Sequence, residues 1–331
     1  MRAIQLNSYS ATPDLHVIEK PTPQPGQGQV LIKMAAAPIN PSDVMFTQGR
    51  YGFKKPLPVV PGFEGSGIVI ATGTDWVSRF FMGRRVACLA PDTGDGTWAD
   101  HLVTSALRCI PLIRDVSLEQ GAMAAINPIT AWALLDIARR SGHRCLIHTA
   151  AASQVGRMLI RLGRRQGIEI VNIVRRPEQV ALLQALGATI VLNSNETHFD
   201  SQLKTLCREK KIKLAFDAVA GDLPERLLQA MPAGARVTIY GALSESVTPF
   251  NPGQFIFKDK TVDGFYLPTW LGRQNVITQL LTTYRVQKLM TSDLHSQVHA
   301  RVPISAGAQG LETYLANMTE GKVLFVPSPV L

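Results

Sequence analysis

The regular alternation of short apolar runs with helical segments after about Leu118 is the feature that most constrains the fold. Such a strand-helix-strand series forms a parallel sheet with helices on its faces. Strands are predicted at Cys145–His148, Glu169–Val174, Thr189–Leu192, Leu214–Asp217, Val237–Tyr240 and Thr261–Phe265. The predicted fold class is therefore α/β, with a doubly wound parallel sheet in this part of the chain.

The sequence before this series has a different texture. Gln29–Met34 alternates after a Pro/Gly-rich stretch, and Gly67–Ala71 and Arg85–Leu89 are further short apolar runs. This pattern predicts a β-rich domain that ends near Asp115. Beyond Leu267 the pattern is mixed again. It predicts a helix over Asn275–Leu289 and a last strand over Val323–Val326.

The composition limits the class of protein. Of the 331 residues, 46% are hydrophobic and 18% are charged, which is typical of a folded globular chain. Four widely spaced cysteines form no Cys-x-x-Cys pair, so we expect reduced thiols rather than a zinc site or a disulfide framework. No signal-peptide pattern and no apolar run of membrane-spanning length is found. We therefore expect a cytoplasmic protein without a membrane partner.

The formal charge of +9 is concentrated in one region. Between Asp136 and Arg176 there are nine arginines against two acids. Such a face can attract nucleic acid, nucleotide phosphates, coenzyme A or an acidic carrier protein, or it can be a solvated surface. No nucleic-acid motif accompanies the arginines, so a nucleic-acid partner is not expected.

A turn that suits a dinucleotide follows the first strand of the parallel sheet. The strand ending at His148 leads into small residues and then a helix, where a pyrophosphate would meet helix N-terminal amides. Only Gly156 remains of the G-x-G-x-x-G pattern, since Ala151 and Ser153 occupy the first two glycine positions. The motif alone is weak.

The end of the second strand adds a second signal. An acid usually stands there to bind the ribose 2′-hydroxyl of NAD, but this chain has Arg175 and Arg176. A guanidinium at this position can bind a 2′-phosphate. The sequence therefore favours NADPH as the cofactor.

Taken together, the motifs resemble the medium-chain dehydrogenase/reductase superfamily along essentially the whole chain, up to Gly321–Leu324. The resemblance implies a GroES-like β-rich catalytic domain interrupted by a Rossmann domain. The expected boundaries are residues 1–115 for the first part of the catalytic domain, 116–265 for the NADP-binding domain and 266–331 for the return segment. It also implies an active site between the domains and a homodimer joined through the Rossmann domains, to which the apolar Phe250–Phe257 segment could contribute.

Two positions bear on zinc. This chain has Asn40 where zinc alcohol dehydrogenases carry a cysteine, and Gly62-Phe63-Glu64 where they carry Gly-His-Glu. The seven histidines show no metal-ligand spacing. We expect neither a catalytic nor a structural zinc.

Three separated segments resemble 2-enoyl thioester reductases, a zinc-free branch of the superfamily. Ile39–Asp43, followed by Gln48–Gly52, resembles the segment whose tyrosine, here Tyr51, is the proposed proton donor. Asn127–Ala131 resembles the nicotinamide-side turn, and Gly264–Trp270 resembles the aromatic active-site strand.

The resemblance also assigns binding roles residue by residue. The expected cofactor-binding residues are Asn127, Ala152, Ser153, Gln154, Val155, Arg175, Arg176, Tyr240, Gly241, Phe265, Tyr266, Leu267 and Lys322, and the expected substrate pocket contains Asn40, Tyr266 and Trp270. Ordinary packing or surface exposure is the alternative for Tyr51, Tyr266, Trp270 and Lys322. Gln154 and Ala220 depart from the small residues and glycine usual in the family.

The implied reaction is hydride transfer from NADPH to the β-carbon of an α,β-unsaturated thioester or related enone, with Tyr51 protonating the α-carbon. A phenol with a pKa of about 10 is protonated at neutral pH and can act as a general acid. One alternative is an NADPH:quinone oxidoreductase, which needs no such donor. A second is a basic NADPH-binding protein that acts mainly by binding RNA or protein.

Overall fold

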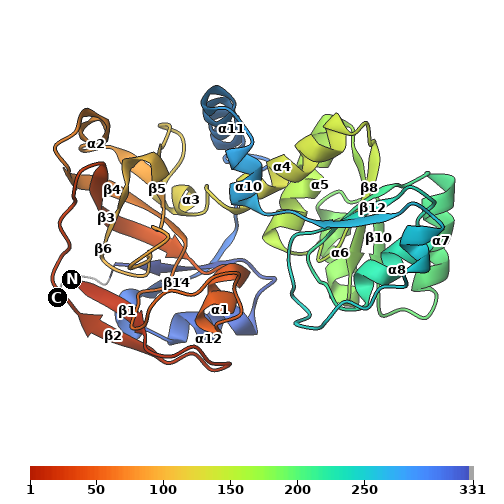
Figure 1. Cartoon of the computed structure of the whole chain (residues 1–331), viewed down its shortest axis with the longest axis horizontal. Helices are drawn as coiled ribbons and strands as arrows, with labels where there is room; N and C mark the ends of the chain where they lie inside the picture. The colour runs from red at the N-terminus through yellow and green to blue at the C-terminus, as the bar shows by residue number, and fades with distance from the viewer. Residues whose placement is uncertain (328–331) are drawn as a thin grey trace. The chain divides into compact units, whose positions relative to one another are not determined.

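The computed structural model describes residues 1–327. The chain forms two compact units, one made of Met1–Asn127 with Thr283–Leu331 and the other of Pro128–Thr282. The chain passes between them within helix α4 (Asn127–Arg140) and again within helix α11 (Val276–Leu289). Each unit has its own sheet and its own core (Figure 1).

The first unit is built on a sheet in the order β14-β15-β3-β4-β5-β7, with β6 also paired to β3, and on a separate β1-β2 hairpin. The last strand of the chain joins this sheet beside an early one, because β15 pairs antiparallel to β3. The strands are β1 (Arg2–Leu6), β2 (Leu15–Glu19), β3 (Gln29–Pro38), β4 (Glu64–Thr72), β5 (Arg85–Leu89), β6 (His101–Ser105), β7 (Cys109–Pro111), β14 (Val298–Pro303) and β15 (Lys322–Val326). The helices are α1 (Pro41–Thr47), α2 (Trp76–Phe80), α3 (Leu118–Ala122), α12 (Gln309–Ala316) and the 3-10 turns η1 (Ala106–Arg108) and η2 (Ile304–Ala306).

The core of the first unit combines residues from both ends of its sequence. Trp98 is fully buried, and its ring lies 5.0 Å from that of Phe325. Its indole N–H donates to the carbonyl of Pro38 at 3.3 Å, which satisfies the polar atom of an otherwise apolar side chain. The return segment therefore completes a core that the first 127 residues leave open.

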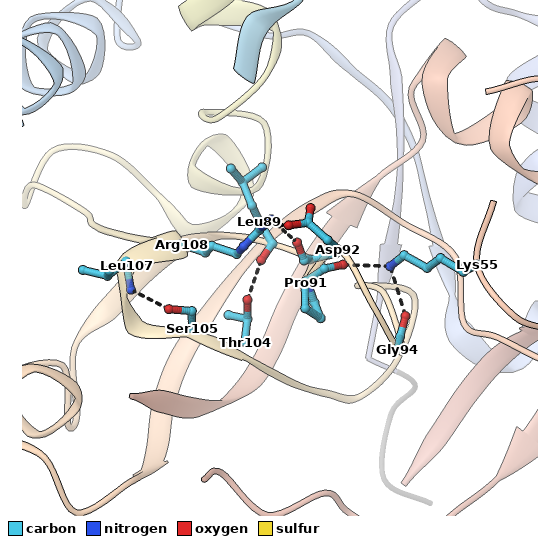
Figure 2. Close-up of polar contacts among 10 residues, drawn as sticks. Lys55, Leu89, Pro91, Asp92, Gly94, Thr104, Ser105, Leu107 and Arg108 are labelled. Atoms are coloured by element: carbon cyan, nitrogen blue, oxygen red, sulfur yellow. Dashed lines mark hydrogen bonds and ion pairs between the residues drawn. The ribbon is translucent and has the colours of Figure 1, made fainter. Parts of the chain in front are cut away.

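Polar side chains hold the loop between β5 and β6 (Figure 2). The nearly fully buried Lys55 donates its ammonium protons to the carbonyls of Pro91 at 2.8 Å and Gly94 at 3.0 Å. Arg108 donates to the carbonyl of Ala90 at 2.8 Å and pairs with Asp92. A side chain from another part of the unit thus takes the place of regular secondary structure in fixing this loop.

The second unit contains a six-stranded sheet in the order β10-β9-β8-β11-β12-β13, with every neighbouring pair parallel. In chain order this is the 3-2-1-4-5-6 arrangement of a Rossmann sheet. Its strands are β8 (Cys145–His148), β9 (Glu169–Val174), β10 (Ile190–Asn193), β11 (Leu214–Asp217), β12 (Arg236–Ile239) and β13 (Thr261–Gly264). The helices that follow α4 are α5 (Gln154–Gln166), α6 (Pro177–Ala185), α7 (Phe199–Glu209), α8 (Leu223–Ala230), α9 (Gly253–Ile256) and α10 (Leu267–Gly272).

Two apolar clusters cover the two faces of this sheet. On one face, Ile160 of α5 and Leu183 of α6 pack with Val174 of β9. On the other face, α7 and α8 pack over β8, β9 and β11, with Phe199 and Leu227 fully buried. Both faces are covered, which explains why these strands are mainly apolar and do not alternate strictly between apolar and polar residues.

The predicted α/β class with a GroES-like part and a Rossmann part is confirmed. Three of the predicted sheet strands, Cys145–His148, Glu169–Val174 and Leu214–Asp217, have the observed bounds. Two of the remaining three are shifted by one residue at both ends, to Ile190–Asn193 and Arg236–Ile239, and the third, Thr261–Gly264, ends one residue earlier than predicted. The helix predicted over Asn275–Leu289 begins one residue later, at Val276.

Candidate functional site

The nucleotide turn of the second unit connects β8 to α5. Ser153 caps the helix, because its hydroxyl accepts a hydrogen bond from the amide of Gly156 at 3.2 Å. A Cβ at Gly156 would lie 2.2 Å from the carbonyl oxygen of Ala151, so only glycine fits there. The side-chain oxygen of Gln154 is buried without a hydrogen-bond partner in the described chain. The turn thus offers a ligand the helix amides and a side-chain oxygen that lacks a hydrogen-bond partner.

A buried carboxylate ties this turn to the neighbouring strand. Asp217, at the end of β11, accepts hydrogen bonds from the Thr149 hydroxyl at 2.7 Å and from the amides of Val219 and Ala220 at 3.1 and 2.6 Å. Burial raises the pKa of Asp217, and these hydrogen bonds oppose that rise. Ala220 has a φ of 62°, so this alanine adopts the left-handed conformation that favours the glycine usual in the family.

Tyr240 follows β12 and is held at both its backbone and its ring. Its amide donates to the carbonyl of Asp217 at 2.7 Å. Its ring stacks on that of His148, with centroids 5.8 Å apart, and its hydroxyl oxygen lies 2.6 Å from His148 Nε2. Burial lowers the pKa of His148 to about 3 and raises that of Tyr240. Both side chains are therefore neutral near pH 7.

Arg175 and Arg176 lie at the end of β9, and both are exposed. The amide of Arg175 donates to the side-chain oxygen of Gln179 at 3.3 Å. Its carbonyl accepts a hydrogen bond from the side-chain amide of Asn195 at 2.9 Å. These contacts fix the backbone from which the first guanidinium projects, so the strand end offers a defined cationic site.

The aromatic segment follows β13. Phe265 extends the strand by donating its amide to the carbonyl of Ile239 at 2.8 Å. Tyr266 precedes α10 and is half exposed, while Leu267 begins that helix and Trp270 lies within it. Because all strands of this sheet are parallel, their carboxyl ends share one edge. The sheet thus brings the nucleotide turn, the arginine pair, Tyr240-Gly241 and the aromatic segment to the same edge.

The first unit contains a second polar site, which is buried. The side-chain amide of Asn40 donates to Glu64 Oε1 at 3.0 Å, and its oxygen accepts a hydrogen bond from the ammonium of Lys322. The second oxygen of Glu64 accepts from the amides of Ala125 and Ile126 at 3.1 and 3.0 Å. These contacts link β4, the start of α1 and β15 to the segment just before α4.

Asp43 of α1 completes this polar cluster, which we define as Asn40, Asp43, Glu64 and Lys322. Its carboxylate accepts from the amide of Asn40 at 2.8 Å and from that of Phe63 at 3.0 Å. Burial raises the pKa of Asp43 to about 7 and lowers that of Lys322 to about 8. Burial also raises the pKa of Glu64, against the pull of the Lys322 charge. The lysine is the cation that neutralises these buried acids.

The polar cluster does not fit a zinc ion. The carboxylate oxygens of Asp43 and Glu64 are already occupied by N–H donors, and an ammonium lies where a metal would need electron pairs. Phe63 presents a phenyl ring where a zinc dehydrogenase has an imidazole. Within residues 1–327 no group of three or more His, Cys, Asp or Glu side chains is arranged to hold a metal.

Tyr51 lies in a neighbouring aromatic cluster, just after α1. Its ring centroid is 4.8 Å from that of Phe63 and 5.1 Å from that of Phe53, and its amide donates to the carbonyl of Met45 at 3.1 Å. Phe63 is in turn bonded through its amide to Asp43. The half-buried Tyr51 ring is therefore held by packing next to the polar cluster.

The sequence-predicted residues thus fall into two groups. Asn40, Tyr51 and Lys322 lie in the first unit, where Asn127 begins α4 directly after the segment bonded to Glu64. The remaining predicted residues lie at the sheet edge of the second unit. Sequence reasoning missed the roles of Asp43, Glu64, His148, Thr149 and Asp217. All five are polar residues at strand ends or next to the quoted motifs, and this position in the sequence was the only feature that could have pointed to them.

Family comparisons agree with this division of the chain. A model described as "Alcohol dehydrogenase GroES-like domain" matches residues 26–115, and one described as "Zinc-binding dehydrogenase" matches residues 155–284. The mitochondrial enoyl-[acyl-carrier-protein] reductase of Arabidopsis thaliana is 30% identical over 78% of this chain and 70% of that protein. Its Rattus norvegicus counterpart is 34% identical over 73% of this chain, and the match covers only 65% of that protein.

Solved structures match over nearly the whole chain. One described as an NADPH:quinone reductase from Mesorhizobium loti is 36% identical with a TM-score of 0.91, covering 99% of this chain and 98% of that one. An enoyl thioester reductase from Candida tropicalis, in a mutant form, shares the fold at 22% identity and a TM-score of 0.77, covering 98% and 99% of the two chains.

The fold and these matches define a dehydrogenase/reductase with a GroES-like unit and a Rossmann unit. The chain belongs to the medium-chain dehydrogenase/reductase superfamily, in its zinc-free branch. None of the helices within residues 1–327 is long and apolar enough to cross a membrane.

Proposed function

We propose that this protein is an NADPH-dependent oxidoreductase that reduces the C=C bond of a 2-enoyl thioester or a related enone. The observation that carries the proposal is the pair of exposed arginines at the end of β9, beside a nucleotide turn capped by Ser153. The identities with enoyl-[acyl-carrier-protein] reductases support the substrate class. The zinc-free polar cluster supports a reaction that needs no metal to polarise a carbonyl.

The Rossmann edge supplies the residues that would hold the cofactor. Ala152–Val155 and the first amides of α5 would bind the pyrophosphate, and Arg175 with Arg176 would bind the 2′-phosphate. Tyr240-Gly241 and Phe265–Leu267 would flank the nicotinamide. When bound, NADPH supplies the hydride that reduces the β-carbon of the substrate.

Tyr51 would supply the proton that the α-carbon needs after hydride transfer. Its phenol is a general acid that is protonated at neutral pH, and its packing against Phe53 and Phe63 restricts the ring. Asn40 of the first unit would contact the substrate, and Tyr266 and Trp270 of the second unit would contact its acyl part. The polar cluster would fix Asn40, whose amide is bonded on both sides to charged groups.

The cofactor assignment is tested by binding. Replacing both Arg175 and Arg176 by alanine removes the charges for the 2′-phosphate, so affinity for NADPH should fall at least tenfold while affinity for NADH stays within about twofold. Arg164→Ala, in the exposed last turn of α5, is the matched control and should change neither affinity. Equal losses for both cofactors, or none, would contradict the assignment.

Quinone reduction is the second candidate, because the Mesorhizobium loti structure described as an NADPH:quinone reductase is 36% identical over 99% of this chain. A quinone accepts hydride without protonation at an α-carbon, so Tyr51→Phe separates the two functions. The enoyl reductase account expects thioester turnover to fall about 100-fold or more, in line with the usual contribution of a general acid, with quinone turnover retained.

The proposal also covers the oligomeric state and the cellular location. A homodimer through the Rossmann unit is expected, since β13 lies at one end of the sheet order and Ile256 and Phe257 nearby are 69% and 82% exposed. Light scattering of the wild type and of Phe257→Asp tests this expectation. The predicted cytoplasmic location contrasts with relatives named as mitochondrial, and cell fractionation distinguishes the two.

A further inference from the structure

His148 is a fully buried histidine at the nucleotide edge that the mechanism above does not use. It ends β8, and its ring stacks on Tyr240 with an interplanar angle of 18°. Nε2 lies 2.6 Å from the phenol oxygen, while Nδ1 is buried without a hydrogen-bond partner in the described chain. An unsatisfied buried polar atom in a stacked pair calls for a physical reason.

The unpartnered Nδ1 indicates which ring nitrogen carries the proton. A neutral imidazole has one N–H, and the low pKa of His148 keeps the ring neutral. A proton on Nδ1 would be a buried N–H without an acceptor, and orphaned N–H groups are rarer in proteins than unpaired acceptors. A proton on Nε2 leaves Nδ1 as an unpaired acceptor and donates to the Tyr240 oxygen.

This choice of tautomer determines what Tyr240 can do. If the phenol oxygen accepts from Nε2–H, the phenol proton is available for another acceptor. Tyr240 is only half buried, and it follows β12 at the edge that also carries the nucleotide turn. The raised pKa of Tyr240 keeps the hydroxyl protonated across the neutral range.

We propose that His148 is a positioning residue that fixes the Tyr240 hydroxyl as a hydrogen-bond donor to the nicotinamide end of bound NADPH. The carboxamide oxygen is the acceptor of suitable chemistry there. This inference rests on the proposed function, because it takes the sheet edge of the second unit as the cofactor site. It adds one residue to that function: His148 lies behind the binding surface and orients Tyr240, which lies on that surface.

Three variants test the proposal through NADPH fluorescence titrations, which do not require turnover. His148→Phe keeps a stacked ring but removes the donor, and Tyr240→Phe removes the hydroxyl. Each should weaken NADPH binding about tenfold, near the upper end for one hydrogen bond. The double variant should be no weaker than either single one, because both remove the same interaction.

His148→Gln provides a rescue, since its side-chain amide can still donate to the phenol oxygen and should restore most of the affinity. His143→Phe, before the opposite end of β8, is the matched control and should leave binding unchanged. Nitrogen chemical shifts of ¹⁵N-histidine-labelled protein should place the His148 proton on Nε2.

Several outcomes would overturn the proposal. A His148→Phe protein with lower unfolding stability and unchanged NADPH affinity would make His148 merely structural. Additive losses in the double variant, or a proton found on Nδ1, would also refute it. Failure of the wild type to bind NADPH would instead refute the proposed function, so the two failures are distinguishable.

Discussion

Removing the Lys322 ammonium should destabilise the first unit strongly, and more at pH 8 than at pH 5. Lys322→Met keeps the length of the side chain but leaves Glu64 and Asp43 buried without their cation. Breaking a buried ion pair by removing one partner costs about 3–5 kcal/mol. Because the pKa of Lys322 is itself lowered to about 8, the lysine is only partly charged at pH 8, and we expect a loss at the lower end of this range in the free energy of unfolding there.

The pH dependence follows from the carboxyl pKa values. The folded-state pKa of Asp43 is about 7, against an ordinary value of 3.8, so the folded form binds a proton between these values while the unfolded form does not. Ionisation of Asp43 therefore reduces stability as the pH rises through about 4 to 7. Loss of Lys322 raises the pKa values of Asp43 and Glu64 further. Each additional pKa unit lowers the free energy of unfolding at pH 8 by about another 1.4 kcal/mol.

The assay is urea unfolding at pH 5 and pH 8, with hydrogen exchange of β3 and β15 as a local probe of the first unit. Lys55→Met is the matched control, because Lys55 is also a buried lysine but donates to the backbone carbonyls of Pro91 and Gly94 (Figure 2). It should lose about 1–3 kcal/mol, with a smaller change between the two pH values. A Lys322→Met loss that is equal at both pH values would refute the electrostatic account of the polar cluster.

Further predictions concern thiols and backbone geometry. Burial raises the pKa of Cys109, Cys145 and Cys207 to about 12, and that of Cys88 well above its usual range, so a disulfide reagent at pH 7.5 should label fewer than one thiol per native chain and four after denaturation. Ala220→Gly should raise the free energy of unfolding by about 1 kcal/mol, because Ala220 has a φ of 62°, whereas Gly221→Ala should lower it by about 1–2 kcal/mol. Urea titration distinguishes these signs, and a less stable Ala220→Gly protein would contradict the backbone strain inferred at Ala220. Gly156→Ala should abolish NADPH binding measured by fluorescence, since its Cβ would collide with the Ala151 carbonyl; unchanged affinity would remove this turn from the cofactor site.

The strands of the second unit could be predicted from sequence because they are covered on both faces. Runs such as Glu169–Val174 are apolar at four of six positions without strict alternation, and polar or small residues mark their ends. In the first unit, short strands such as β2 and β7 carry fewer buried residues, so the pattern indicated only a β-rich region. The pairing of β15 with β3 joins distant segments, which no local periodicity reveals.

The candidate site was predictable where chemistry is local in sequence. The arginines after β9 follow the nucleotide turn at the spacing that a 2′-phosphate site requires, so the sequence alone predicts this role, and the role stays a prediction. The bonds that organise the site join distant residues. His148 and Tyr240 are 92 positions apart, Thr149 and Asp217 are 68 apart, and Lys322 and Asn40 are 282 apart.

Lys322 shows most clearly what could not be predicted from the sequence. Its position in the family motif predicted a residue near the cofactor, and that role stays a prediction. The structure adds that its ammonium is buried and bonded to Asn40 and to the carbonyl of Ile39. The need for a cation at this point arises from Asp43 and Glu64, which the fold brings together.

Steady-state oxidation of NADPH by the purified protein tests the central claim most directly, with a short 2-enoyl coenzyme A thioester compared with a 1,4-quinone at the same concentration. The account predicts faster turnover of the thioester, and loss of that turnover in Tyr51→Phe. Turnover of the quinone alone would contradict the enoyl reductase assignment and leave a quinone reductase. Turnover of neither substrate would contradict the proposed reaction as a whole.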